Sequence, residues 1–151
     1  MEIAKKIVRA TEEIFNTMIF LEIAAGEPLT QEERVPSHVS AMIGLSGDFS
    51  GMLSIHCPDL VGPAIAGAML GMDLEEVDAD VKDALGEISN MLAGGIKEAF
   101  AAEKIALEIA IPTAISGKSY TISSPTGSNR VIIPFSTEQG RFFVEMKYSP
   151  T

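Results

Sequence analysis

The sequence predicts an α+β fold in which one N-terminal helix and a central pair of helices pack on a largely antiparallel sheet. Apolar residues recur at helical spacing in the first part of the chain and again in its middle, whereas the last third alternates apolar and polar residues as strands do. The order of elements is therefore helix, strands, two helices and strands. Because helices and strands do not alternate one by one, an antiparallel sheet is favoured over a parallel one.

The composition predicts a single domain over residues 1–151. Hydrophobic residues make up 46% of the chain and charged residues 21%, whereas disordered chains combine low hydrophobicity with high net charge. A chain of 151 residues fits one compact core. No linker, low-complexity tract or repeat divides the sequence.

The net charge of −10, from 11 Lys and Arg against 21 Asp and Glu, excludes several classes of partner. Nucleic-acid binding depends on basic side chains, and anionic membrane surfaces attract them. The uncharged run 60–72 is shorter than the roughly 20 residues that span a bilayer, and residues 1–6 lack a secretory pattern. Cys57 is the only cysteine, so no intrachain disulfide can form. The sequence therefore predicts a soluble cytoplasmic protein that binds neither nucleic acid nor membrane.

The N-terminal third is expected to hold one helix, a short strand and a loop. The helix should run over about residues 2–17, and the strand over 20–24, where Gly26 and Pro28 then break the chain. The polar segment 30–37 is expected to be a loop. The residues that place the helix share a spacing of three or four positions: Ile3, Ile7, Ala10, Ile14 and Met18.

A β-hairpin is expected next, because two apolar runs, 39–45 and 52–57, flank a cluster of Gly, Ser and Asp at 46–51. The alternating last third predicts four further strands, with the final turn at 138–140. These strands are expected at 106–112, 118–123, 130–135 and 141–148.

The central helix pair lies between the hairpin and these strands. A short helix is expected over 60–70, with Asp59 as its N-cap and a glycine directly after its end. Five acidic residues follow in 73–80, and either Asp78 or Asp80 is expected to cap a long helix that ends near residue 102. Carboxylates are favourable at a helix N-terminus, so this acidic run is first of all structural.

Two apparent ligand motifs fail on spacing. Residues 116–119, Ser-Gly-Lys-Ser, resemble the end of a phosphate-binding loop, but Pro112 stands where that loop needs its first glycine, and a strand pattern follows. His38 and His56 have no ligand at metal-binding spacing except Cys57, and adjacent residues on a strand point to opposite faces. We expect neither a nucleotide site nor a metal site.

One row of polar residues stands out on the long helix. At 100° per residue, Asp83, Glu87 and Asn90 fall within roughly 60° of one another, and Gly94 continues the same line. The opposite side of the helix should face the core. Its apolar residues are Val81, Leu85, Ile88, Leu92, Ile96 and Ala99.

Two interpretations of this row are open: an ordinary solvated helix face, or a working surface. Asn is a poor residue for the middle of a helix, so an exposed face gains nothing from Asn90. Each of Gly86, Gly94 and Gly95 costs roughly 1 kcal/mol relative to Ala, which indicates that something approaches the helix closely.

The segment 83–91, with its pattern Asp-x-x-x-Glu-x-x-Asn, is similar to the signature of the CheC/CheX/FliY chemotaxis phosphatases. In that family a proline follows further along the chain, and Pro112 stands at about that position. The hairpin at 43–55 and the helix end at 68–72 also resemble the family. The length suits the CheX branch, and the likeness extends over most of the chain.

The resemblance implies a protein phosphatase that dephosphorylates the aspartyl-phosphate of a CheY-like response regulator. By this likeness Asn90 positions the attacking water and Glu87 anchors the regulator's lysine, with Asp83 and Gly94 contacting the partner. No cofactor of its own is expected, since Mg²⁺ belongs to the response regulator. The resemblance to the CheX branch also implies a homodimer, in which strands near the C-terminus could pair edge to edge between chains.

Two alternatives stay open. Glu13 and Asn16 repeat the Glu-x-x-Asn spacing on the first helix, as in the two-site CheC branch, although Arg9 stands where Asp or Ser would be expected. This pair is either a second active site or part of an ordinary exposed helix face. The other alternative is a non-catalytic CheX-like adaptor that binds a response regulator or a flagellar switch component.

Overall fold

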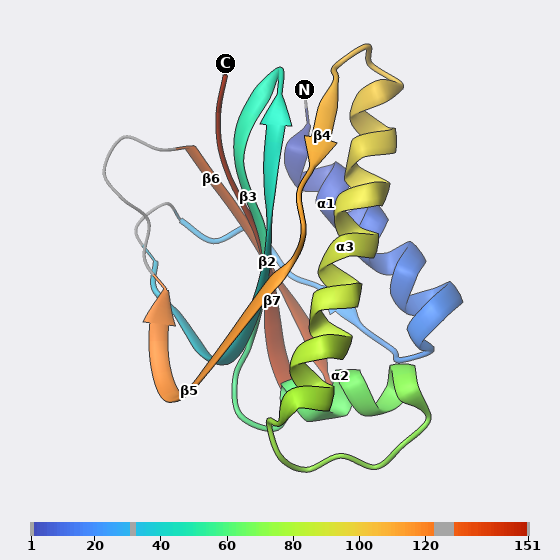
Figure 1. The fold of residues 1–151 in the computed structure, drawn as a ribbon, viewed down its shortest axis with the longest axis vertical. Coiled ribbons are helices and arrows are strands. Elements are labelled where there is room, and N and C mark those ends of the chain that lie inside the picture. The colour runs from blue at the N-terminus through green and yellow to red at the C-terminus, as the bar shows by residue number, and fades with distance from the viewer. Residues whose placement is uncertain (1, 31–32, 123–128, 151) are drawn as a thin grey trace.

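The computed structural model describes residues 2–30, 33–122 and 129–150, and within them it confirms the α+β fold (Figure 1). Helix α1 spans Ile3–Ile14, α2 spans Val61–Leu70 and α3 spans Ala79–Ala101. All three pack on the same face of one sheet, with α3 lying along it and α2 at one end (Figure 1).

The sheet is antiparallel at every pairing of the described residues, in the order β1-β6-β7-β3-β2-β4. β2 pairs with two strands on its outer side: its first part, residues 35–42, pairs with β5, and its end, residues 45–47, pairs with β4. β4 and β5 therefore line one edge of the sheet together. The strands are β1 (Ala24–Ala25), β2 (Val35–Gly47), β3 (Phe49–Cys57), β4 (Leu107–Ile109), β5 (Thr113–Ile122), β6 (Asn129–Thr137) and β7 (Gly140–Pro150).

The N-terminal third differs most from expectation. After Ile14 the helix widens into a π-helix, Phe15–Ile19, and Phe20 ends it with a left-handed backbone at φ 62°. The expected strand over 20–24 is therefore wrong, and only β1 pairs with the sheet. The expected loop over 30–37 is also wrong at its end, since β2 begins at Val35 and pairs there with β5. A distant strand overrides the local turn signal.

The ends of the two later helices depend on different contacts. Asp59 is not the N-cap of α2, because its backbone has φ 32° and its N–H donates to Nδ1 of His38 at 2.7 Å. Gly71 ends that helix at φ 69°. Asp78, rather than Asp80, caps α3, since its Oδ1 accepts the N–H of Val81 at 3.0 Å. This cap fixes where the long helix begins.

The core lies between the helices and the sheet. The predicted inner stripe of α3 is fully buried except at Ala99, which is half-buried. Phe142 on β7 stacks between Phe15 and Phe135, with ring centroids 5.1 and 5.2 Å apart. The aromatic stack packs the π-helix on β6 and β7. The buried stripe packs α3 on the sheet and so sets the orientation of its outer face.

The opposite face of the sheet contains a buried polar network with side chains from four strands. His56 Nε2 donates to Oε1 of Glu145 at 2.9 Å, and its Nδ1 lies 2.7 Å from Oγ of Ser40. Arg130 donates through Nε to the other oxygen of Glu145 and through Nη1 to the carbonyl oxygen of Glu33 at 2.6 Å. The network ties β2, β3, β6 and β7 to the segment that precedes β2.

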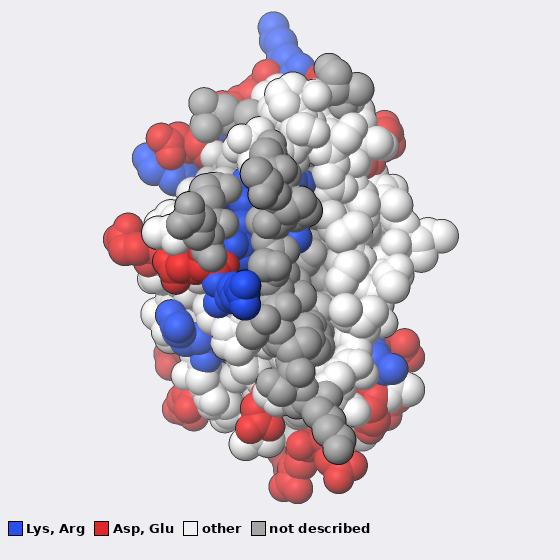
Figure 2. All heavy atoms as spheres, turned by 90° about the vertical axis from the view of Figure 1, so that its left-hand side faces the viewer, with Lys and Arg blue, Asp and Glu red and all other residues white. Residues whose placement is uncertain are grey.

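The surface charge is dispersed. Figure 2 shows Asp and Glu side chains around the margins of one face, with several Lys and Arg among them, rather than a single acidic patch. No helix within the described ranges is long and apolar enough to cross a membrane. The charge of −10 therefore leaves room for locally uncharged or basic contacts.

Candidate functional site

The outer face of α3 presents the polar row that its spacing predicts. Asp83 and Glu87 are exposed, while Asn90 and Gly94 are half-buried. The row stays aligned because α3 is α-helical from its Asp78 cap to Ala101. The first two residues are therefore fully accessible from outside, and the last two are partly accessible.

One flank of α3 is the link between β4 and β5. A Cβ placed on Gly86 would lie 3.9 Å from Cβ of Pro112, an ordinary van der Waals distance. Gly86 is four residues before Asn90, so Pro112 packs beside the helical turn directly below the amide. The structure therefore brings the signature and the proline together, although 22 positions separate Asn90 from Pro112 in the sequence.

The other flank of α3 is α1. A Cβ on Gly95 would lie 3.3 Å from Cβ of Ala10, so this glycine permits close helix packing. Gly94 differs, because a Cβ there would meet nothing within 4 Å. Between the two helices lies a groove of about 890 Å³, which Met18, Met91 and Gly94 help to line. Of the three glycines, only Gly94 faces open space.

The two carboxylates of the row are available to a partner. Within residues 2–30, 33–122 and 129–150, neither Asp83 nor Glu87 forms an ion pair. By contrast, Lys97 on the same helix does have an ion-pair partner, since its Nζ lies 3.6 Å from Oε2 of Glu108. An exposed carboxylate without an intramolecular cation can accept a charge-assisted hydrogen bond from a lysine of another molecule.

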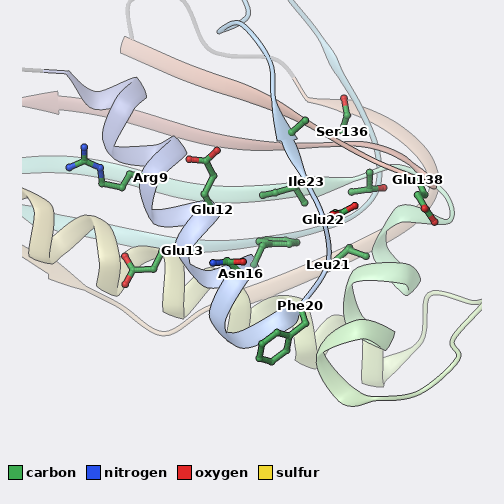
Figure 3. A pocket seen from close by; sticks show the side chains of 13 residues that line it. Arg9, Glu12, Glu13, Asn16, Phe20, Leu21, Glu22, Ile23, Ser136 and Glu138 are labelled. Carbon is green, nitrogen blue, oxygen red and sulfur yellow. The ribbon is translucent and has the colours of Figure 1, made fainter.

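The second Glu-x-x-Asn motif lies elsewhere and has a different geometry. Glu13 and Asn16 are both exposed and line a pocket of about 1000 Å³ beside α1 (Figure 3). Glu13 is on α1, but Asn16 lies on the π-helix, whose wider turn changes the angle between successive side chains. The alignment that a regular helix gives Glu87 and Asn90 is not reproduced here, and Arg9 remains in place of an acid.

The buried polar network contains the same kinds of side chain as a hydrolytic triad, but a substrate cannot reach them. Ser40, His56 and Glu145 are hydrogen-bonded in that order. Each residue is at most 1% exposed, so no substrate reaches Oγ of Ser40. Sequence reasoning missed this cluster, because 16 and 89 positions separate its hydrogen-bonded pairs.

Electrostatic shifts also identify structural rather than catalytic groups. Burial alone would raise the pKa of Glu145, but hydrogen bonds and charge from His56 and Arg130 outweigh it and hold that pKa below its ordinary value. Burial raises the pKa of the Cys57 thiol, which is therefore not a reactive thiolate. No group of His, Cys, Asp and Glu in the described part of the chain could hold a metal ion.

Comparisons with known proteins point to one family. A family model described as "Chemotaxis phosphatase CheX" matches residues 39–136. That range includes Asp83, Glu87, Asn90 and Pro112 and leaves out the Glu-x-x-Asn motif of α1. The chain is also similar to the CheY-P phosphatase CheX of Thermotoga maritima, at 27% identity over 126 residues, which cover 81% of this chain and 80% of that protein.

Solved structures agree with the family match. The chain is similar to the chemotaxis protein CheX from Desulfovibrio desulfuricans, at 34% identity and a TM-score of 0.89, covering 99% of this chain and 100% of that one. It also shares its fold, at 23% identity and a TM-score of 0.82, with a chain of the CheX–CheY–BeF₃–Mg²⁺ complex from Borrelia burgdorferi, covering 96% of each.

Proposed function

Because the chain belongs to the CheX family of chemotaxis phosphatases, we propose that it hydrolyses the aspartyl-phosphate of a CheY-like response regulator, with Glu87 and Asn90 at the reacting centre. The observation that carries this proposal is the outer face of α3, where the two side chains lie one turn apart next to the open position at Gly94. The Thermotoga relative, which is a CheY-P phosphatase, supports the same substrate class.

The proposed reaction requires this chain mainly to position the attacking water. An aspartyl-phosphate is already reactive, and the regulator supplies the Mg²⁺ and the lysine that neutralise the developing charge. The amide of Asn90 can both donate and accept hydrogen bonds, so it can hold a water in line with the phosphorus. On this proposal the protein needs no cofactor of its own.

Glu87 has a different role in this proposal. Its exposed carboxylate, which forms no ion pair in the described part of the chain, would bind the regulator's active-site lysine. Glu87 then anchors the complex, while Asp83, one turn earlier, contacts the rim of the partner.

A panel of purified response regulators, each phosphorylated in the presence of Mg²⁺, tests the activity. The protein should accelerate phosphate release from at least one of them. Binding without any change in the lifetime of the phosphate would favour the non-catalytic adaptor, whether its partner is a regulator or a flagellar switch component.

Gly94→Leu is expected to weaken the complex without unfolding the protein. Leu is a better helix former than Gly and meets open space at this position, so the free energy of unfolding should not fall. Its side chain would occupy the space that a regulator needs, and the KM for the phosphorylated regulator should rise about tenfold. Gly94→Ala is the matched control and should stay close to wild type. A Leu variant with an unchanged KM would contradict the partner role of this position.

The pair Glu13 and Asn16 is expected not to act as a second site. The π-helix disturbs its alignment and Arg9 replaces the expected acid. Asn16→Ala should therefore retain the full rate of phosphate release, measured at saturating regulator. A loss of about half the rate would instead support a two-site enzyme.

Homodimer formation is a separate part of the proposal. β7 lies inside the sheet between β6 and β3, so it offers no free edge. Among the described residues β5 pairs only with β2, which leaves its outer edge for a strand of a second copy. Sedimentation at several protein concentrations measures this, and a strict monomer would contradict it.

A further inference from the structure

Ile111 is the most exposed large apolar side chain in the described part of the chain, at 86%. A single exposed apolar residue is ordinary on a protein surface. What sets this one apart is its backbone, which both neighbours hold in place, and its position beside the proposed active face.

Both neighbours of Ile111 are fixed by contacts within the fold. The N–H of Ala110 donates to the carbonyl oxygen of Gly44 at 3.0 Å, and Pro112 packs against α3 at Gly86. Ile111 therefore stands on an anchored stretch of chain between β4 and β5. A backbone held in this way loses little conformational entropy when a partner covers the side chain that it carries.

The position of Ile111 is continuous with the Glu87–Asn90 face. Pro112 lies beside the turn of α3 that contains Gly86, one turn before Asn90, and Ile111 is the residue before Pro112. In Figure 1 the link between β4 and β5 runs along α3.

The surroundings of Ile111 are uncharged. Residues 109–117 contain no Asp, Glu, Lys or Arg. Figure 2 turns the front of Figure 1 to its right-hand side, and most of that side carries no charged side chains. The segment that carries Ile111 therefore has no charged side chain of its own.

We propose that Ile111 is an apolar anchor for the phosphorylated response regulator, buried against an apolar patch on the rim of the regulator's phosphorylation site. The inference rests on the proposed function, since it assigns the occupant of the α3 face. Protein interfaces commonly combine one buried apolar residue with polar contacts around it. Here Glu87 and Asn90 supply the polar contacts, and Ile111 supplies affinity.

The test compares Ile111→Ser with Met72→Ser, a matched control. Met72 is also exposed, at 53%, but follows the end of α2, at the end of the molecule away from the β4–β5 link (Figure 1). Two quantities are measured for each: the Kd for a regulator activated with beryllofluoride and Mg²⁺, and the kcat and KM for phosphate release. Thermal unfolding verifies that both variants fold.

Ile111→Ser should raise both Kd and KM about tenfold, the effect of losing one buried aliphatic side chain. Its kcat at saturating regulator should equal that of wild type, and Met72→Ser should match wild type throughout. A wild-type Kd for Ile111→Ser would overturn the inference and leave the proposed function intact.

Further outcomes separate the two proposals. If wild type binds the activated regulator but does not speed phosphate release, the proposed function fails, and the Kd of Ile111→Ser still decides the inference. If wild type binds no regulator of the panel, both fail. If Ile111→Ser abolishes self-association and leaves the Kd unchanged, Ile111 is a contact between copies of this chain and the inference is overturned.

Discussion

Asn90→Ala is expected to reduce the accelerated rate of phosphate release about 100-fold or to the regulator's own rate, whichever is reached first. The amide is the group that orients the attacking water, and nothing in alanine replaces it. Binding should change little, because Glu87 and the neighbouring contacts remain. The measurement is kcat and KM with a phosphorylated regulator in the presence of Mg²⁺.

The same substitution should leave the fold intact. Asn90 is half-buried on the outer side of α3, and Ala is the better helix former, so the free energy of unfolding should stay equal or rise slightly. Function and stability then point in opposite directions at this position, as is common for active-site residues.

Two further variants sharpen this result. Asn90→Asp keeps the shape but loses the N–H₂ donor and adds a charge, so it should also be inactive. Glu98→Ala, an exposed change two turns further along α3, is the control and should retain wild-type activity. An active Asn90→Asp would contradict the role of the amide donor.

Glu145→Ala is expected to destabilise the protein by about 3–5 kcal/mol, the cost of leaving a buried ionic partner uncompensated. Arg130 and His56 both hydrogen-bond to this carboxylate, and all three residues are at most 2% exposed. Urea unfolding at neutral pH measures the change. Glu108→Ala is the control, because the side chain of Glu108 is 76% exposed and its pair with Lys97 should contribute less than about 1 kcal/mol.

The pH dependence of stability tests the same carboxylate. Its partners hold the pKa of Glu145 in the folded state below the ordinary value of 4.5. Its contribution is therefore complete above pH 4.5 and disappears as the pH falls through the lower, folded-state pKa. Glu145→Gln should remove this part of the acid sensitivity. A wild-type acid profile in the Gln variant would show that other carboxylates control unfolding.

The sequence predicted well what depends on local signals. The Asp78 cap and the helical spacing of apolar residues fix α3, and the same spacing aligns Glu87 with Asn90. Both are properties of one continuous segment, so no tertiary contact had to be known. The hairpin of β2 and β3 is likewise local, because the two paired strands are neighbours in the sequence and a short turn joins them.

What the sequence did not predict depends on contacts between distant segments. The start of β2 at Val35 comes from pairing with β5, and the buried polar network joins four strands. The position of Pro112 beside the turn that precedes Asn90 has the same origin. Ile111 had no signal of its own within a run of apolar residues, and only the exposure of its side chain distinguishes it.

The most direct test follows the lifetime of the aspartyl-phosphate on a cognate response regulator, with Mg²⁺ present, after addition of wild-type protein or of the Asn90→Ala variant. We expect the wild type to shorten that lifetime and the variant to leave it close to the regulator's own value. A lifetime that wild type does not change, or that both proteins shorten equally, would contradict catalysis by the outer face of α3.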